Sequence, residues 1–220
     1  MSTVIVYPYP SVDGVYAAFA YYVLFGKPAD FSMLYVPVTT LPTWEEIELL
    51  LEKLRPKDDV YFLGVSAPID LITKVYNITL KGVMRLNVRE AAMEHISVGT
   101  LFNFWIRSKK SETEFKKCSS ARLAWEHFLQ ESDWMLPFQR IKRPFLSRRN
   151  ELYHMIELIE DDELGRHELP QSKEFALGFR ELGLELSYEK NPNIFEELLA
   201  LDEKEVCQRG RKLVKETCTL

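Results

Sequence analysis

Cysteine is scarce in this 220-residue chain, and its three cysteines, Cys118, Cys207 and Cys218, stand far apart. None belongs to a CxxC pair or lies at metal-ligand spacing from a histidine, which excludes a disulfide scaffold and argues against a zinc site. Residues 1–14 lack the pattern of a signal or transit peptide, although an earlier removal of a leader stays open. We therefore expect reduced thiols and an intracellular location, cytoplasmic rather than mitochondrial.

Long apolar runs and the common phosphate-binding loops are also missing. The longest apolar run, Val15–Phe25, reaches about half the length of a membrane span, so no membrane span is expected. The strings GxGxxG, GxxxxGK[ST] and GxSxG do not occur, which excludes the nucleotide-binding and serine-hydrolase classes that they mark. With 46% hydrophobic and 28% charged residues, the composition is that of an ordinary globular protein.

The net charge of −5 is unevenly spread along the chain. Residues 101–150 carry 11 basic and 5 acidic side chains, whereas residues 151–220 carry 9 and 17. This asymmetry favours electrostatically guided contact with an acidic partner or with the acidic end of the same chain.

Short β-branched and aromatic runs alternate with helical patterns over the first 90 residues. The predicted strands are Thr3–Tyr7, Met33–Pro37, Val60–Val65 and Gly82–Leu86. The predicted intervening helices are Val15–Phe25, Leu41–Leu54 (with a Thr43–Glu46 capping box) and Ile69–Tyr76. Such alternation indicates βαβ units and a parallel sheet flanked by helices, an α/β fold.

From about residue 90 onward the pattern is mainly helical. The predicted helices are His95–Ile106, Ser119–Leu129 and Leu146–Leu158 (the last two N-capped), Phe195–Leu199 and Glu203–Val214. We expect residues 1–92 to form the α/β core, with the helical residues 93–220 packed on it as one continuous domain.

Five segments in sequence order resemble the DHH (RecJ-like) phosphoesterase family. IVYPYPSVDGVYAAFAYYVLFG, which starts at Ile5, is similar to that family's opening, and SSARLAWEHF to one of its helices. The other matching segments are DVYFLGVSAP, GVMRLNVREA and IEDDELGRHELPQSKEFALGF. In this family, carboxylates and histidines at the ends of parallel strands bind two manganese ions, which activate water for phosphoester hydrolysis. The resemblance implies the fold of that family's N-terminal domain.

Most of the family's metal-binding positions are changed in this chain. Pro8 stands at a histidine position, Ser11 at a cysteine or aspartate position, and Gly64 at an aspartate position. The Asp-His-His triplet reads Asn87-Val88-Arg89. Because hard divalent ions need several oxygen or imidazole ligands and Arg89 adds a fixed positive charge, we expect the metal centre to be lost, with no catalytic residue and no cofactor. Mn²⁺ or Mg²⁺ would be a cofactor only under the alternative hypothesis, in which the chain is a phosphoesterase with atypical metal ligands.

Two carboxylates of the family set remain, Asp13 and Asp161. The favoured interpretation is that Asp13 caps the helix in which it lies and that Asp161 belongs to a solvated acidic face. The alternative is an ion pair from either carboxylate to Arg89 across a vestigial cleft.

The stretch Phe138–Arg149 interleaves basic side chains with aromatic ones. Its candidate contact residues for a partner or a nucleic acid are Arg140, Lys142, Arg143, Arg148 and Arg149. A solvated loop or a docking surface for an acidic protein is favoured over nucleic acid, because the net charge of the chain is negative.

The hypothesis for function is therefore a catalytically inactive DHH-like protein that serves as a binding or structural component, with a protein partner or a second copy of itself. The alternatives are a metal-dependent phosphoesterase or exonuclease with atypical ligands and a nucleic-acid-binding module. The family's C-terminal substrate domain carries a GGGH-type motif that is missing here, so we expect an open side of the cleft to serve as the contact surface.

Overall fold

The computed structural model describes residues 2–25, 32–80, 83–86, 118–135 and 148–217. At its centre lies a four-stranded parallel sheet in the order β2-β1-β3-β4. The strands are β1 (Ser2–Pro8), β2 (Ser32–Val38), β3 (Asp59–Leu63) and β4 (Val83–Leu86). The predicted α/β class is confirmed, and each predicted strand is found within two residues of its expected ends.

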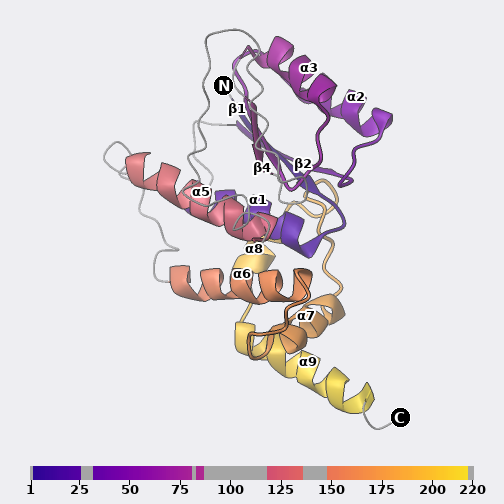
Figure 1. The fold of residues 1–220 in the computed structure, drawn as a ribbon, viewed down its shortest axis with the longest axis vertical. Coiled ribbons are helices and arrows are strands. Elements are labelled where there is room, and N and C mark those ends of the chain that lie inside the picture. The colour runs from indigo at the N-terminus through magenta and orange to yellow at the C-terminus, as the bar shows by residue number, and fades with distance from the viewer. Residues whose placement is uncertain (1, 26–31, 81–82, 87–117, 136–147, 218–220) are drawn as a thin grey trace.

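Helices cover both faces of this sheet, and the alternation of side chains along the strands explains why (Figure 1). Val4 and Val6 of β1 pack under α2 (Trp44–Lys53) and α3 (Ile69–Thr79) on one face. On the other face, Ile5 and Tyr7 join the larger core built with α1 (Val12–Phe25) and α5 (Ser120–Met135). A strand that is apolar on both faces requires this double cover.

The first helix, α1, is buried on nearly its whole surface because it is enclosed on several sides. It packs against the sheet and alongside α5, which also contacts β3 and β4, and its aromatic side chains meet α8 (Ile194–Ala200). Phe195 of α8 stacks on Phe19 and Tyr22, with ring centroids 6.4 and 5.3 Å away. The C-terminal part of the chain is thus joined to the sheet unit through α1.

A second layer of helices lies beneath α1 and α5 and consists of α6 (Arg149–Glu163), α7 (Ser172–Glu181) and α9 (Glu203–Thr217) (Figure 1). Helices α7 and α9 cross at their glycines. A Cβ atom at Gly178 would lie 1.9 Å from the carbonyl oxygen of Val206, so the two backbones are nearly in contact.

Two helical predictions are corrected by the structure. Helix α6 begins at Arg149, and Arg148 at its N-cap position makes no capping bond through its side chain, so the predicted N-cap is wrong. Helix α7 was not predicted. Its N-cap residue, Gln171, has a left-handed backbone and makes no side-chain capping bond, so the usual start signal is missing.

The predicted helix His95–Ile106 lies outside the described residues. Among the helices that are described, none combines the length and the hydropathy required to span a membrane.

Candidate functional site

The carboxyl ends of β1 and β3 mark the place where a ligand would be expected in this fold. These strands are neighbours, and their connections leave to opposite faces of the sheet, through α1 and through α3. Open α/β sheets bind ligands in the crevice at such a switch point. Pro8 ends β1 and Gly64 directly follows β3, so two of the predicted cleft residues do lie at this position.

The N-terminus of α5 fills the crevice. A Cβ atom at Gly64 would lie 2.6 Å from the Oγ atom of Ser120 and 3.5 Å from Cγ of Pro8. The backbone of Gly64 also has a φ of +71°, a left-handed conformation that most side chains avoid. An aspartate at this position, as in the resembling family, would need room that α5 occupies.

Asp13 holds the N-terminus of α5 in place. Its Oδ2 atom accepts a hydrogen bond from the backbone N–H of Ser120 at 2.9 Å, and Oδ1 accepts one from Ala121 at 2.8 Å. Desolvation of this fully buried carboxyl raises the pKa of Asp13, and the bonds from α5 offset only part of that rise. Both oxygens of this carboxylate therefore accept hydrogen bonds from N–H groups at the start of α5, which would otherwise be buried without partners.

The predicted role of Asp13 as the cap of its own helix is therefore wrong. The Oγ atom of Ser11 performs that role, because it accepts a hydrogen bond from the N–H of Gly14 at 3.0 Å. Asp13 already lies inside the first turn of α1, where its side chain reaches across to α5 instead. Ser11, another predicted cleft residue, has a structural role that suits the N-cap preference of serine.

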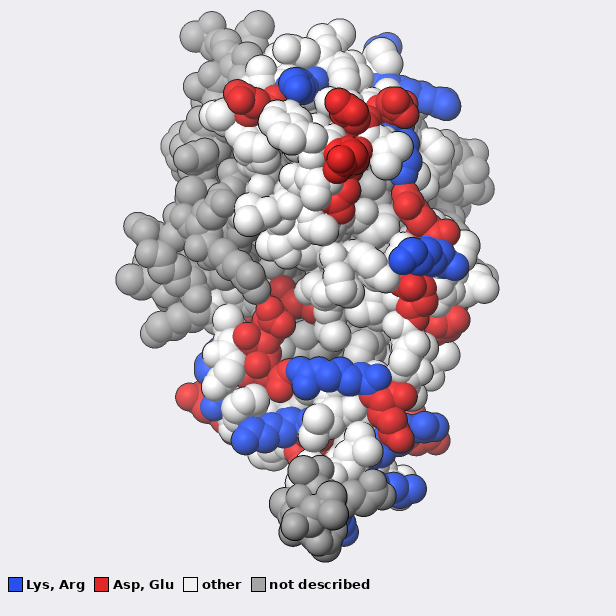
Figure 2. All heavy atoms as spheres, turned by 90° about the vertical axis from the view of Figure 1, so that its right-hand side faces the viewer, with Lys and Arg blue, Asp and Glu red and all other residues white. Residues whose placement is uncertain are grey.

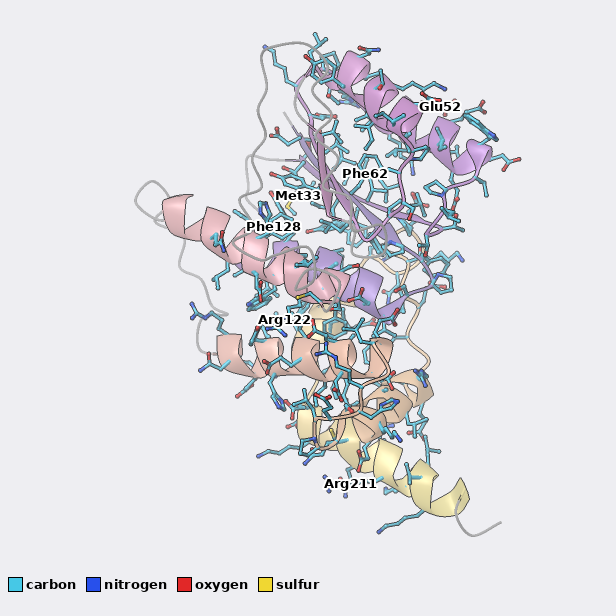
Figure 3. The ribbon with its side chains drawn as sticks, viewed as in Figure 1. Met33, Glu52, Phe62, Arg122, Phe128 and Arg211 are labelled. Atoms are coloured by element: carbon cyan, nitrogen blue, oxygen red, sulfur yellow. The ribbon has the colours of Figure 1, made fainter. Side chains whose placement is uncertain are left out.

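A second buried carboxylate, Glu160 of α6, completes the capping of α5 and was not singled out from the sequence. Its Oε2 atom accepts from the N–H of Ser119 at 2.9 Å. Its Oε1 atom accepts from Arg122 and from Arg166, each at 2.8 Å. Figure 3 shows Arg122 in the space between α5 and α6. Glu160 thus joins α5, α6 and the loop after α6 through charge-assisted bonds.

Asp161 is buried, so its assignment to a solvated acidic face is wrong. Its two oxygens accept from the N–H groups of Glu168 and Leu169, at 3.0 and 3.1 Å. Burial alone would raise the pKa of Asp161, but the Ser172 hydroxyl, the loop amides and the positive charge of Arg166 outweigh it and lower that pKa. This carboxylate therefore organises the loop between α6 and α7.

The predicted partner of these carboxylates across the cleft, Arg89, lies outside the described residues, as does Asn87. The ion pair from Asp13 or Asp161 to Arg89 thus stays a prediction.

The described residues of this site do not fit a divalent metal centre. Pro8 and Gly64 offer no side-chain ligand, and both oxygens of Asp13 are already bonded to amides. Over the described ranges as a whole, no three histidine, cysteine, aspartate or glutamate side chains are grouped so that they could hold a metal ion. The geometry supports hydrogen bonding between elements at this edge of the sheet.

A small hollow of about 260 Å³ opens beside the loop between β1 and α1. Ser11 and Thr40 line one side, and Phe179 of α7 lines another. At its rim Arg180 forms an ion pair with Asp162 at 2.9 Å, so these two charges satisfy each other. At about 260 Å³ its volume falls just below the roughly 300–1,000 Å³ of typical small-molecule sites.

Of the basic stretch Phe138–Arg149, the structure describes only Arg148 and Arg149. Arg140, Lys142 and Arg143 lie outside the described residues. Arg148 binds within the chain, where its guanidinium donates to the carbonyl oxygens of Leu199 and Leu201 and to Glu151. These bonds attach the start of α6 to the end of α8. Arg149 is exposed and remains a candidate contact residue.

Comparisons with protein-family models, with curated proteins and with solved structures find no match to this chain. The resemblance to DHH phosphoesterases therefore rests on the five sequence segments alone.

Proposed function

We propose that this chain is a catalytically inactive relative of the DHH phosphoesterases that works as a binding or structural component of a larger assembly. The observation that carries the proposal is the pair of hydrogen bonds from Ser120 and Ala121 of α5 to the two oxygens of Asp13. A carboxylate used in this way joins two helices at the position where the family would hold a metal ion.

The energetics of the site favour this function over hydrolysis. For Asp13 to bind a metal, its oxygens would have to turn away from α5 and leave two buried amides without partners. Each buried amide without a partner costs about 1–3 kcal/mol. Pro8 and Gly64 have no side-chain ligand whose bond to a metal could offset that loss. The Asp-His-His triplet is replaced by Asn87-Val88-Arg89 in the sequence.

Metal binding distinguishes the proposal from the alternative of a phosphoesterase with atypical ligands, which would bind metal ions. For an inactive protein we expect less than about 0.1 manganese, magnesium or zinc ion per chain by elemental analysis after dialysis. We also expect no rise of the melting temperature with millimolar Mn²⁺, since a ligand that binds only the native state would raise it. Model phosphodiesters should not be hydrolysed.

The control for this experiment is a pair of aspartate variants. Asp13→Asn changes the candidate ligand, and Asp70→Asn changes an exposed aspartate in the first turn of α3. One or more bound metal ions per chain, lost in Asp13→Asn but kept in a folded Asp70→Asn, would refute the proposal and support the enzyme.

The alternative of a nucleic-acid-binding module receives little support from the described residues. Arg148, one of its five predicted cations, is bound to Leu199, Leu201 and Glu151 within the chain. Binding to RNA or DNA that weakens steeply with salt, and that is lost on reversing the charge of Arg149, would favour this alternative.

A further inference from the structure

Large apolar side chains lie exposed on the outer face of α2. Leu41, just before the helix, is 73% exposed, Trp44 is 69% exposed and Leu49 is 56% exposed. Ile47 and Leu50 point the other way, into the core above the sheet. An uncovered apolar patch of this kind on a folded protein is typical of an interaction surface.

Three carboxylates lie among these apolar groups. Glu45, Glu48 and Glu52 occupy the same exposed side of α2, and Figure 3 shows Glu52 on the outside of that helix. Figure 2 shows acidic side chains in this upper part of the molecule, with lysine and arginine side chains beside them. Within the part of the chain that the structure describes, none of the three carboxylates is in an ion pair. We call Leu41, Trp44, Glu45, Glu48, Leu49 and Glu52 the α2 face.

The chemistry of the α2 face specifies its partner as a segment that is both basic and apolar. The three carboxylates, which make no ion pair to another described residue, attract lysine or arginine. The exposed leucines and tryptophan favour apolar side chains between those cations. The ring of Trp44 already receives one cation, since Lys74 Nζ lies 5.4 Å from its centroid. A further arginine or lysine could therefore be recognised by charge and by the ring together.

This chain itself contains a segment of that chemistry. The sequence FQRIKRPFLS, residues 138–147, places Arg140, Lys142 and Arg143 among two phenylalanines, an isoleucine and a leucine. We propose that the α2 face docks residues 138–147 of a second copy of this chain. The proposal rests on the proposed function as a binding component and names its partner.

Symmetry supports a second copy as the occupant. Each copy carries one α2 face and one basic segment, so two copies related by a twofold axis can make both contacts and close into a dimer. Within one chain the ends of α5 and α6 that flank this segment lie on the opposite side of the molecule from α2 (Figure 1). Attraction between an acidic and a basic surface also overcomes the repulsion between two chains of net charge −5.

A charge-swap experiment on the full chain tests the proposal. One variant carries Glu45→Lys, Glu48→Lys and Glu52→Lys, and the other carries Arg140→Glu, Lys142→Glu and Arg143→Glu. By light scattering and sedimentation at about 50 mM salt, the native chain should be a dimer, and its dissociation constant should rise about tenfold or more at about 0.5 M salt. Each variant alone should be a monomer, because its two contact surfaces then carry like charges.

A one-to-one mixture of the two variants should again form a dimer, since each basic surface meets an acidic one. The matched control reverses three exposed acids elsewhere, Glu168→Lys, Glu181→Lys and Glu205→Lys, and should stay dimeric. Trp44→Ala, which leaves every charge unchanged, should weaken the dimer about tenfold or more, because Trp44 supplies exposed apolar area to the contact.

Three outcomes would overturn the proposal. These are a native chain that is monomeric at about 100 μM, a dimer that survives both reversals, and a mixture of variants that stays monomeric. A monomer that binds a synthetic 137–149 peptide at the α2 face would point to a basic segment of another protein as the occupant and would overturn the second copy. None of these outcomes involves metal. The proposed loss of catalysis is therefore tested separately, by the manganese experiment.

Discussion

The sheet unit and the helical layer beneath it are stabilised in different ways. In the sheet unit, β1 to β4 pair in register along the backbone, and valine, phenylalanine and tyrosine side chains fill both faces. In the helical layer, buried carboxylates of α6 bind backbone amides of α5 and of the loop after α6, and α7 meets α9 through glycines. Apolar packing tolerates small changes of shape, whereas a buried carboxylate or a backbone contact has one geometry that satisfies it.

Asp13 joins α1 to α5 beneath the sheet, because it binds the amides at the start of α5. Glu160 of α6 then joins α5 to the helical layer below it. The edge of the sheet where α/β proteins usually bind ligands is thus occupied here by hydrogen bonds between the protein's own helices. Each region should depend on its own kind of contact.

The largest effect is expected from Asp13→Ala, which removes the joint between α1 and α5. Two buried amides of α5 lose their acceptor, so the free energy of unfolding should fall by about 3–4 kcal/mol. Urea denaturation followed by circular dichroism measures the loss. The control, Asp70→Ala at an exposed first-turn position of α3, should cost less than about 1 kcal/mol. Equal losses in the two variants would contradict the joining role of Asp13.

A smaller loss in the free energy of unfolding is expected from Gly210→Ala, which changes only a contact within the helical layer. The new Cβ atom would lie 1.8 Å from the carbonyl oxygen of Glu174, so α7 and α9 must move apart. The cost should be about 2–3 kcal/mol in spite of the better helix propensity of alanine. Gly183→Ala is the control, because no atom lies near its Cβ position and only its backbone φ of +61° is strained, at about 1 kcal/mol.

Asp161→Asn should cost about 1–2 kcal/mol at neutral pH and should make the loss depend on pH. The pKa of Asp161 is lowered from 3.8 in the folded chain, so its carboxylate stabilises the fold above about pH 4, and that stabilisation is lost as the pH falls through the lowered pKa. Asparagine lacks this contribution at every pH. The difference between native and variant chain should therefore be constant above about pH 5 and shrink below pH 4.

Urea denaturation between about pH 3 and pH 7 measures this difference. Asp162→Asn, at a partly exposed neighbour paired with Arg180, is the control. A difference that does not change with pH would contradict the carboxylate role of Asp161 in the loop.

The smallest effect is expected in the sheet unit, from Thr43→Ala at the start of α2. Thr43 and Glu46 form the capping box that the sequence predicts, with bonds of 3.3 and 2.8 Å. Its loss should cost about 1 kcal/mol. Thr73→Ala, whose hydroxyl bonds only to the preceding turn of α3, should cost less, and a larger loss there would contradict the capping role.

The sheet and its helices could be predicted because their signals are local. Strands β1 and β3 stand out as apolar runs, and the capping box marks α2 within four residues of sequence. Helix α7 could not be predicted, because its start carries no capping bond and its position depends on α9.

The α/β class and the four strands follow from local patterns of the sequence, which also places no metal-binding side chain at Pro8 or Gly64. Only the tertiary structure decided what the remaining carboxylates do. Asp13 binds amides more than 100 positions away in the chain, and Glu160 reaches α5 from α6. The hydrogen-bond partner of a single carboxylate cannot be predicted from the sequence around it. Its burial and its distance to a donor are set only when elements far apart in the chain pack together.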